Sequence, residues 1–171
     1  MSKKDLKNYL ESLEKKDIIK IVLDTYSNNK DAKEFLEYLV NPDIEEKFRK
    51  AQKIILEEYF PEKKFPPNAK VSVAKRAISD FKKFNPPNEL IAELMLFLVK
   101  QICLFIDEYG INDDPYYDIV ENNYDNALKF IYQNKLHKKF KDKIIIGPFH
   151  NALYLNELLM EIVLNYDDDL L

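Results

Sequence analysis

Glycine is the residue whose scarcity most constrains this chain. Only Gly110 and Gly147 occur in 171 residues, whereas average usage would place glycine at about 7% of positions. A phosphate-binding loop, a dinucleotide-binding turn and a nucleophile elbow each need two or three glycines within a few residues, because the backbone must approach phosphate or turn at positive φ. The sequence therefore excludes all three of these sites.

Long segments on either side of the two glycines repeat apolar residues at a helical spacing. In the first of them, Leu6, Tyr9 and Leu13 stand at i, i+3 and i+7, which places them on one face of an amphipathic helix. Ser2 precedes this segment as a candidate N-cap. Similar segments recur along the chain, so the sequence predicts an all-α fold of about nine antiparallel helices. The two glycines fall between such segments and are predicted to end helices.

Residues 89–109 form a segment that is apolar on nearly every side. Asn88 precedes this segment and is its predicted N-cap. Glu93, Lys100 and Gln101 are the main polar interruptions of the segment. A helix without a polar face is normally enclosed by other helices. We therefore expect the remaining helices to pack around this central apolar helix, either as a bundle or as a superhelix of helical hairpins.

Length and composition favour a single helical domain over residues 1–171. Hydrophobic residues make up 46% of the chain and charged residues 33%, which is typical of a globular protein rather than a disordered one. Prolines at 61, 66 and 67 predict an irregular connection at about 61–71. Residues 167–171 contain three consecutive aspartates and are expected to form an acidic frayed tail, because negative charge at a helix C-terminus opposes the helix dipole.

Charge and cysteine usage limit the partners and the compartment that we expect. The formal net charge of −4 does not favour binding of polyanions by bulk charge. The single cysteine, Cys103, fits a reducing compartment and is predicted to be a buried, unreactive thiol with a raised pKa. No apolar signal core follows the first lysines, and the longest apolar stretch contains charges. We therefore expect a cytoplasmic protein with no membrane partner.

Several short segments form a recognisable set. They are Ser2–Leu6 with Tyr9–Leu10 and Ser12–Leu13, Asn41–Asp43, Ala77–Lys83, Leu94–Phe97, Glu108–Gly110 and Gly147–His150. Together they resemble a small bacterial family of uncharacterised all-helical proteins, which is a domain of unknown function. The last segment departs from the glycine-aromatic-glycine-Phe-His form of that family, because the second glycine is missing here. The resemblance implies no activity, no cofactor and no catalytic residue.

Lysines cluster in two segments, residues 62–83 and residues 129–143. If both segments faced the same way, they would form a stripe that binds nucleic acid by releasing counterions. The alternative is a pair of solvated helix faces that balance acidic neighbours. The chain has only two arginines, which weakens bidentate recognition of phosphate. The candidate basic patch consists of Lys63, Lys64, Lys70, Lys75 and Arg76.

The polar residues at 79, 80, 82 and 83 interrupt a helix whose other side chains are mostly small and apolar. Ser79 and Asp80 either line a groove for a partner or satisfy backbone groups of the nearby proline-rich connection. His150 has two explanations: it acts as an acid or base together with a carboxylate, or it is a packing residue. Neither His150 nor His137 has a metal-type partner at i+3 or i+4. The candidate partner-binding residues are Ser79, Asp80, Lys82, Lys83 and His150, and no catalytic residue or metal ligand is predicted.

An acidic loop at 111–114 also has two explanations. Its oxygens suit a divalent cation, but the loop lacks the alternating carboxylates, central glycine and terminal glutamate of an EF-hand. The alternative is that Asp113 or Asp114 caps the helix that Pro115 opens.

These observations favour a non-catalytic helical module that binds another protein. Catalytic motifs are missing, whereas Phe and Tyr are abundant at 11 each and charge is segregated along the chain. The alternative is nucleic-acid association through the lysine-rich segments 62–83 and 129–143. A third hypothesis, an enzyme assembled from His150 and scattered carboxylates, is disfavoured by the missing motifs. No cofactor is implied.

Overall fold

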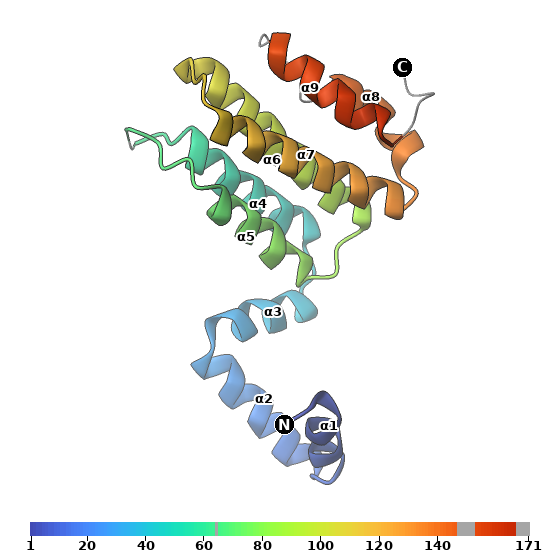
Figure 1. The fold of residues 1–171 in the computed structure, drawn as a ribbon. Helices are drawn as coiled ribbons and strands as arrows, with labels where there is room; N and C mark the ends of the chain where they lie inside the picture. Colours follow the sequence, from blue (N-terminus) through green and yellow to red (C-terminus); the bar gives the residue numbers. More distant parts are fainter. Residues whose placement is uncertain (64, 147–152, 167–171) are drawn as a thin grey trace. The chain divides into compact units, whose positions relative to one another are not determined.

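A computed structural model describes residues 1–63, 65–146 and 153–166 of the chain, without the side chains of residues 145, 146, 153–156 and 158. Within these residues the fold contains nine helices and no strand (Figure 1), which confirms the predicted all-α class. The helices are α1 (Lys3–Glu11), α2 (Lys15–Asn28), α3 (Lys30–Val40), α4 (Ile44–Tyr59), α5 (Val71–Lys82), α6 (Asn88–Tyr109), α7 (Asp114–Gln133), α8 (His137–Ile146) and α9 (Leu153–Leu164).

The contacts within the chain divide it into two compact units. Unit 1 spans Met1–Asp43 and holds α1 to α3, and unit 2 spans Ile44–Leu171 and holds α4 to α9. The predicted single domain over residues 1–171 stays a prediction.

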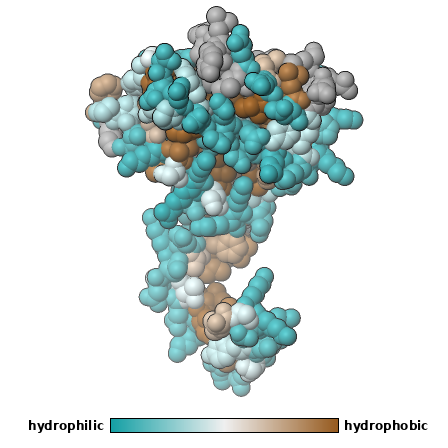
Figure 2. Space-filling model, in the orientation of Figure 1, coloured by the Kyte–Doolittle hydropathy of each residue, from teal (hydrophilic) through white to brown (hydrophobic). Residues whose placement is uncertain are grey.

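Unit 1 has well-formed helix ends but no buried residue in any of its three helices. Ser2 caps α1 as predicted, since its hydroxyl accepts from the Asp5 N–H at 3.2 Å while Asp5 accepts from the Ser2 N–H at 2.7 Å. Asn29 alone separates α2 from α3, and its side chain accepts from Ala32 at the start of α3. Apolar surface gathers over α2 and α3 (Figure 2), so these helices present an uncovered face.

Unit 2 contains the hydrophobic core. Its helix α6 packs against α4, α5 and α7, and α7 packs in turn against α8 and α9. Half of the 22 residues of α6 are buried, and they include Leu94, Leu98 and Ile102. Residues 89–109 are therefore helical, as predicted, but they are not enclosed throughout, since Lys100, Glu108 and Tyr109 are exposed. The expectation that all the other helices pack around α6 stays a prediction.

Gly110 ends α6 as predicted, and it does so in the left-handed conformation at φ +59°. The start of α6 differs from the prediction that Asn88 is its N-cap. Pro87 occupies the N-cap position, and the Asn88 side chain instead donates to Asn134 Oδ1 at 2.7 Å. This bond joins the beginning of α6 to the end of α7, so tertiary packing has taken the amide away from capping.

The connection between α4 and α5 coincides with the predicted irregular stretch at about 61–71, since α4 ends at Tyr59 and α5 begins at Val71. Two hydrogen bonds fasten its far end to α4. The N–H of Ala69 donates to the Glu58 carbonyl at 2.9 Å, and the N–H of Lys70 donates to Glu58 Oε2 at 3.1 Å. Gly147 and the predicted acidic tail at 167–171 lie outside the described residues.

Candidate functional site

The candidate partner-binding residues of α5 separate onto two faces of the helix. Ser79 and Lys82 line a pocket of unit 2 together with Lys75 of the candidate basic patch. These three residues stand at i, i+4 and i+7, the spacing that places side chains on one helix face. Asp80 and Lys83 do not line the pocket; they pair with each other at 2.6 Å.

Helices α5, α6 and α7 form the pocket, which has a volume of about 330 Å³. Buried Ile78 of α5 lies at its base with Met95 and Leu98 of α6. Asn123 and Asn126 of α7 also line it. The pocket thus combines cationic, hydroxyl and amide groups with three apolar side chains.

The two asparagines are the residues of this pocket that sequence reasoning missed. Asn123 Nδ2 donates to the Ile119 carbonyl at 2.5 Å, and Asn126 Nδ2 donates to the Asn122 carbonyl. Each of these bonds uses one N–H of the NH₂ group, so the side-chain oxygen and the second N–H of each asparagine are the groups left for a ligand. Asn is a poor helix former, and a pair of them at i, i+3 inside an apolar-periodic helix was a signal for this site.

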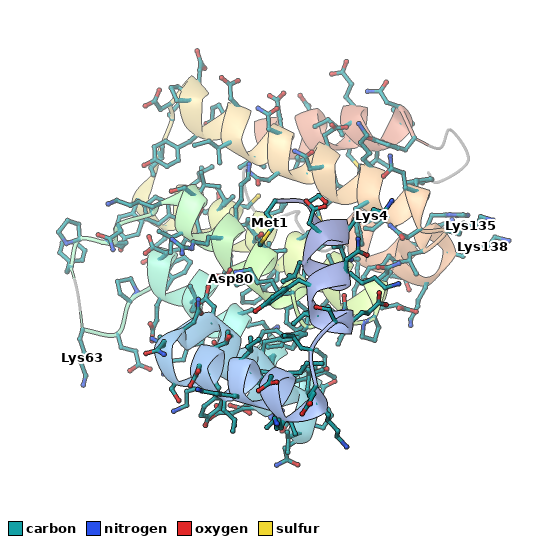
Figure 3. All side chains as sticks on the ribbon, turned by 90° about the horizontal axis from the view of Figure 1, so that it is seen from below. Met1, Lys4, Lys63, Asp80, Lys135 and Lys138 are labelled. Carbon is teal, nitrogen blue, oxygen red and sulfur yellow. The ribbon has the colours of Figure 1, made fainter. Side chains whose placement is uncertain are left out.

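The basic segments meet carboxylates at several points of unit 2. Lys139 lies 3.3 Å from Glu89, and Lys143 lies 2.9 Å from Glu93. Figure 3 shows Lys63 at one side of unit 2 and Lys135 at the opposite side. The two lysine-rich segments therefore do not form one continuous stripe at these labelled positions.

The other residues of the candidate basic patch are dispersed. Arg76 Nε lies 3.8 Å from Asp80, whereas Lys70 stands immediately before α5, where its backbone N–H holds Glu58. Lys64 lies outside the described residues, as does His150. The structure therefore brings Lys75, but not Lys63, into the pocket with the partner-binding candidates.

Metal-type and thiol chemistry were the remaining candidates. Among the residues that the structure describes, no three His, Cys, Asp or Glu side chains come together as a metal site. Asp113 takes the N-cap position of α7 before Pro115, although its side chain makes no capping bond. Cys103 is buried, and its burial raises the pKa of the thiol to about 12, with a smaller contribution from the nearby charge of Asp107. Both its burial and its raised pKa agree with the predicted unreactive thiol.

A second concave surface lies in unit 1, between α2 and α3. It is a groove of about 750 Å³ that is lined mainly by apolar side chains. On α2 the lining side chains stand at i, i+1 and i+4, and on α3 they stand at i, i+3 and i+4. These residues are Val22, Leu23, Tyr26, Leu36, Leu39 and Val40.

One carboxylate, that of Glu37, lines the groove, and neighbouring side chains engage it. The Tyr26 hydroxyl donates to Glu37 Oε1 at 3.0 Å, and Lys33 Nζ lies 3.9 Å from the same oxygen. Lys33 Nζ also lies 5.3 Å above the Tyr26 ring. The charge of Glu37 is therefore compensated within unit 1, and the groove presents an apolar and locally neutral surface.

No helix among residues 1–63, 65–146 and 153–166 combines the length and the apolarity needed to cross a bilayer. In comparisons with known proteins, no curated protein and no solved structure matches the chain. A family model does match, over residues 1–153, and it is described as a family of unknown function (DUF6155). Because the match covers most of the sequence, the chain belongs to this family of unknown function.

Proposed function

We propose that this protein is a non-catalytic protein-binding module whose groove between α2 and α3 receives an amphipathic helix of a partner protein. The observation that supports the proposal is the exposed apolar lining of that groove. Leu23 and Leu39 are 58% and 57% exposed, and Val40 is 86% exposed. Contiguous apolar surface of this kind typically marks an interaction site.

The spacing of the apolar residues favours a helix as the occupant. The apolar lining residues stand at i, i+1 and i+4 of α2 and at i, i+3 and i+4 of α3, the spacing by which helices pack on one another. The groove is concave, and an isologous contact between two copies would require a self-complementary surface. Two copies of one concave groove do not fill each other, whereas a single convex helix fits between α2 and α3.

The charge of the lining favours an apolar face on that helix. Glu37 is compensated by Lys33 and Tyr26, so a partner gains little by offering a cation at this point. An uncompensated charge on the partner would lose hydration without a counter-charge in the lining. The groove therefore selects a stripe of apolar side chains with the polar face of the helix turned to solvent.

The exposed area sets the strength of the interaction. Val22, Leu23, Leu39 and Val40 are 42%, 58%, 57% and 86% exposed. Full burial of such a side chain contributes about 1.5–3 kcal/mol, so covering the remaining surface contributes about 4–7 kcal/mol in total. Association itself costs at least about 4 kcal/mol. Net of that cost the groove lining supplies at most about 3 kcal/mol, and burial of the partner's own apolar face adds to it, so we expect a weak and transient complex.

A designed helical peptide with leucines at i, i+3, i+4 and i+7 tests this proposal. A permuted peptide of the same composition, in which the leucines do not share a face, is the reference. Fluorescence anisotropy with the full chain should show saturable binding of the first peptide and at least tenfold weaker binding of the second. The Leu23→Ser variant should lose binding of the first peptide.

Leu56→Ser is the matched control, because Leu56 is an exposed leucine on α4 of unit 2 and lies outside the groove. It should bind the first peptide like the wild type. Equal binding of both peptides, binding of neither, or retained binding by Leu23→Ser would overturn the proposal. Sedimentation that shows self-association, lost in Leu23→Ser, would assign the groove to a second copy and would overturn it as well.

A further inference from the structure

The pocket between α5, α6 and α7 holds two ammonium groups that have no carboxylate partner among the described residues. Lys75 and Lys82 both line it, and neither makes an ion pair with a residue in the described part of the chain. The carboxylate of α5, Asp80, instead contacts Arg76 and Lys83 on the other side of the helix. The ion pairs of α5 therefore leave the positive charge of the pocket uncompensated.

Aromatic packing fixes one of these lysines. Lys82 Nζ lies 5.2 Å from the centroid of the Phe130 ring, a cation–π contact that joins α5 to α7. Such a contact leaves the N–H donors on the far side of the ammonium group free. Lys75 stands two helical turns earlier, with Ser79 between the two lysines on the same face. The pocket thus presents an ammonium group, a hydroxyl and a second ammonium group in a row.

The remaining surfaces of the pocket differ in chemistry from this row. The side chains of Asn123 and Asn126 each offer an oxygen as an acceptor and one remaining N–H as a donor, since one N–H of each NH₂ group donates within α7. Met95 and Leu98 of α6 provide the apolar floor. The acidic side chain of α7 next to these asparagines, Asp125, accepts from the Tyr166 hydroxyl at 2.6 Å. Its charge is therefore engaged with a residue that does not line the pocket.

We propose that this pocket binds a small ligand that joins an oxyanion, carboxylate or phosphate, to a short apolar body. The oxyanion accepts from Lys75, Ser79 and Lys82, and the apolar body covers Met95 and Leu98. A hydrogen-bond donor at the other end of the ligand would reach Asn123 and Asn126. At about 330 Å³ the pocket lies at the lower limit of ligand sites, which restricts the ligand to a small metabolite-sized molecule.

Methionine methyl NMR of the full chain tests the site directly. The protein has three methionines, Met1, Met95 and Met160, so ¹³C-methyl labelling gives a spectrum in which Met95 reports on the pocket floor. The probes are hexyl phosphate, hexanoate, inorganic phosphate and hexylammonium. Hexyl phosphate or hexanoate should shift the Met95 signal saturably, with Met1 unchanged. Inorganic phosphate should bind more weakly, and hexylammonium should not bind.

The two alkyl probes also separate the two sources of the oxyanion. Tighter binding of hexyl phosphate assigns the site to a phosphate ester, and tighter binding of hexanoate assigns it to a carboxylic acid. Lys75→Ala and Lys82→Ala should each weaken the better probe at least tenfold. Lys83→Ala removes the same charge from the same helix but outside the pocket, so it should leave binding within twofold of the wild type.

Three results would overturn the proposal. One is that neither alkyl oxyanion shifts Met95. Another is that hexylammonium shifts the Met95 signal as strongly, which would mean that the pocket binds the alkyl chain and does not recognise the oxyanion. The third is that Lys83→Ala weakens binding as much as Lys75→Ala, which would reduce the effect to overall charge. Circular dichroism of each variant confirms that the fold is retained before binding is compared.

Discussion

Two buried tyrosines of unit 2 differ in a single hydrogen bond, and replacing each with phenylalanine measures what that bond contributes. Tyr124 is fully buried on α7, and its hydroxyl donates to the Ile144 carbonyl at 2.9 Å. Tyr59 is 1% exposed on α4, and its hydroxyl has no hydrogen-bond partner among the residues that the structure describes. Burial raises the pKa of both phenols, so both are neutral donors at physiological pH.

Tyr124→Phe should destabilise the protein. Ile144 lies in the last turn of α8, where backbone carbonyls have no partner within the helix. Removing the hydroxyl therefore loses the bond and leaves a buried acceptor unsatisfied, which costs about 1–3 kcal/mol. The aromatic ring and its packing are retained, so little hydrophobic contribution is lost. We expect a loss of about 2 kcal/mol in the free energy of unfolding.

Tyr59→Phe should have the opposite sign. The ring of Tyr59 packs edge-on against Phe105, with centroids 5.7 Å apart, and phenylalanine preserves this contact. The unpartnered hydroxyl loses its hydration on folding and gains no bond, which is a cost of about 1–3 kcal/mol in mutational data. Its removal recovers part of that cost. We expect the free energy of unfolding to rise by up to about 1 kcal/mol.

Urea unfolding followed by circular dichroism measures both changes, with the m value checked for each variant. Thermal midpoints should follow with the same signs, by about 2–4 °C per kcal/mol for a chain of this length. The reasoning is refuted if Tyr59→Phe destabilises by more than about 1 kcal/mol, or if Tyr124→Phe is neutral. Either result would mean that the hydrogen bonds of these two hydroxyls are not those described here.

Further expectations concern the thiol, pH, the α6 cap and nucleic acid. Buried Cys103 should react with an aromatic disulfide reagent only on unfolding; full reaction of the native protein would contradict its burial. Burial and the hydrogen bond to Asp125 raise the pKa of Tyr166 to about 12, so stability should fall as pH rises from about 10, where the unfolded phenol ionises, towards 12. In the Tyr166→Phe variant, the free energy of unfolding measured with urea should fall less steeply over the same pH range. Gly110→Ala should lower the free energy of unfolding by about 1–2 kcal/mol, because alanine is strained at a φ of +59°. No atom lies within 4 Å of the added methyl group, so backbone strain is the whole cost. Gly110→Asn should cost less, since Asn tolerates this conformation better. Because Lys139 and Lys143 pair with carboxylates and the two lysine-rich segments do not form one continuous stripe, gel shifts with duplex DNA at low salt should show no binding; a salt-dependent shift would favour the nucleic-acid alternative.

Local chemistry explains why some helix ends could be read from the sequence. Ser2 caps α1, and Gly110 ends α6, because each terminus depends on side chains or backbone freedom within a few residues. Asn88 was misassigned as a cap for the opposite reason. Its amide is held by Asn134, 46 residues away, and no local pattern contains that contact.

The candidate sites were harder to predict, because helix faces become neighbours only through packing. Ser79 and Lys82 were chosen as neighbours of Asp80 and Lys83, but helical geometry turns the two pairs in different directions. Asn123 could not be connected to them from the sequence, since it lies more than 40 residues further along the chain.

The sequence by itself determined that this protein is helical and that it lacks the glycine-rich loops of several catalytic classes, because periodicity and backbone freedom are local properties. Only the tertiary structure decided which apolar stripes are covered. Ile55 of α4 and Leu23 of α2 each belong to the apolar stripe of an amphipathic helix, yet the first is fully buried and the second is 58% exposed. An amphipathic pattern requires that a face be covered but does not specify what covers it, since the hydrophobic effect has no direction.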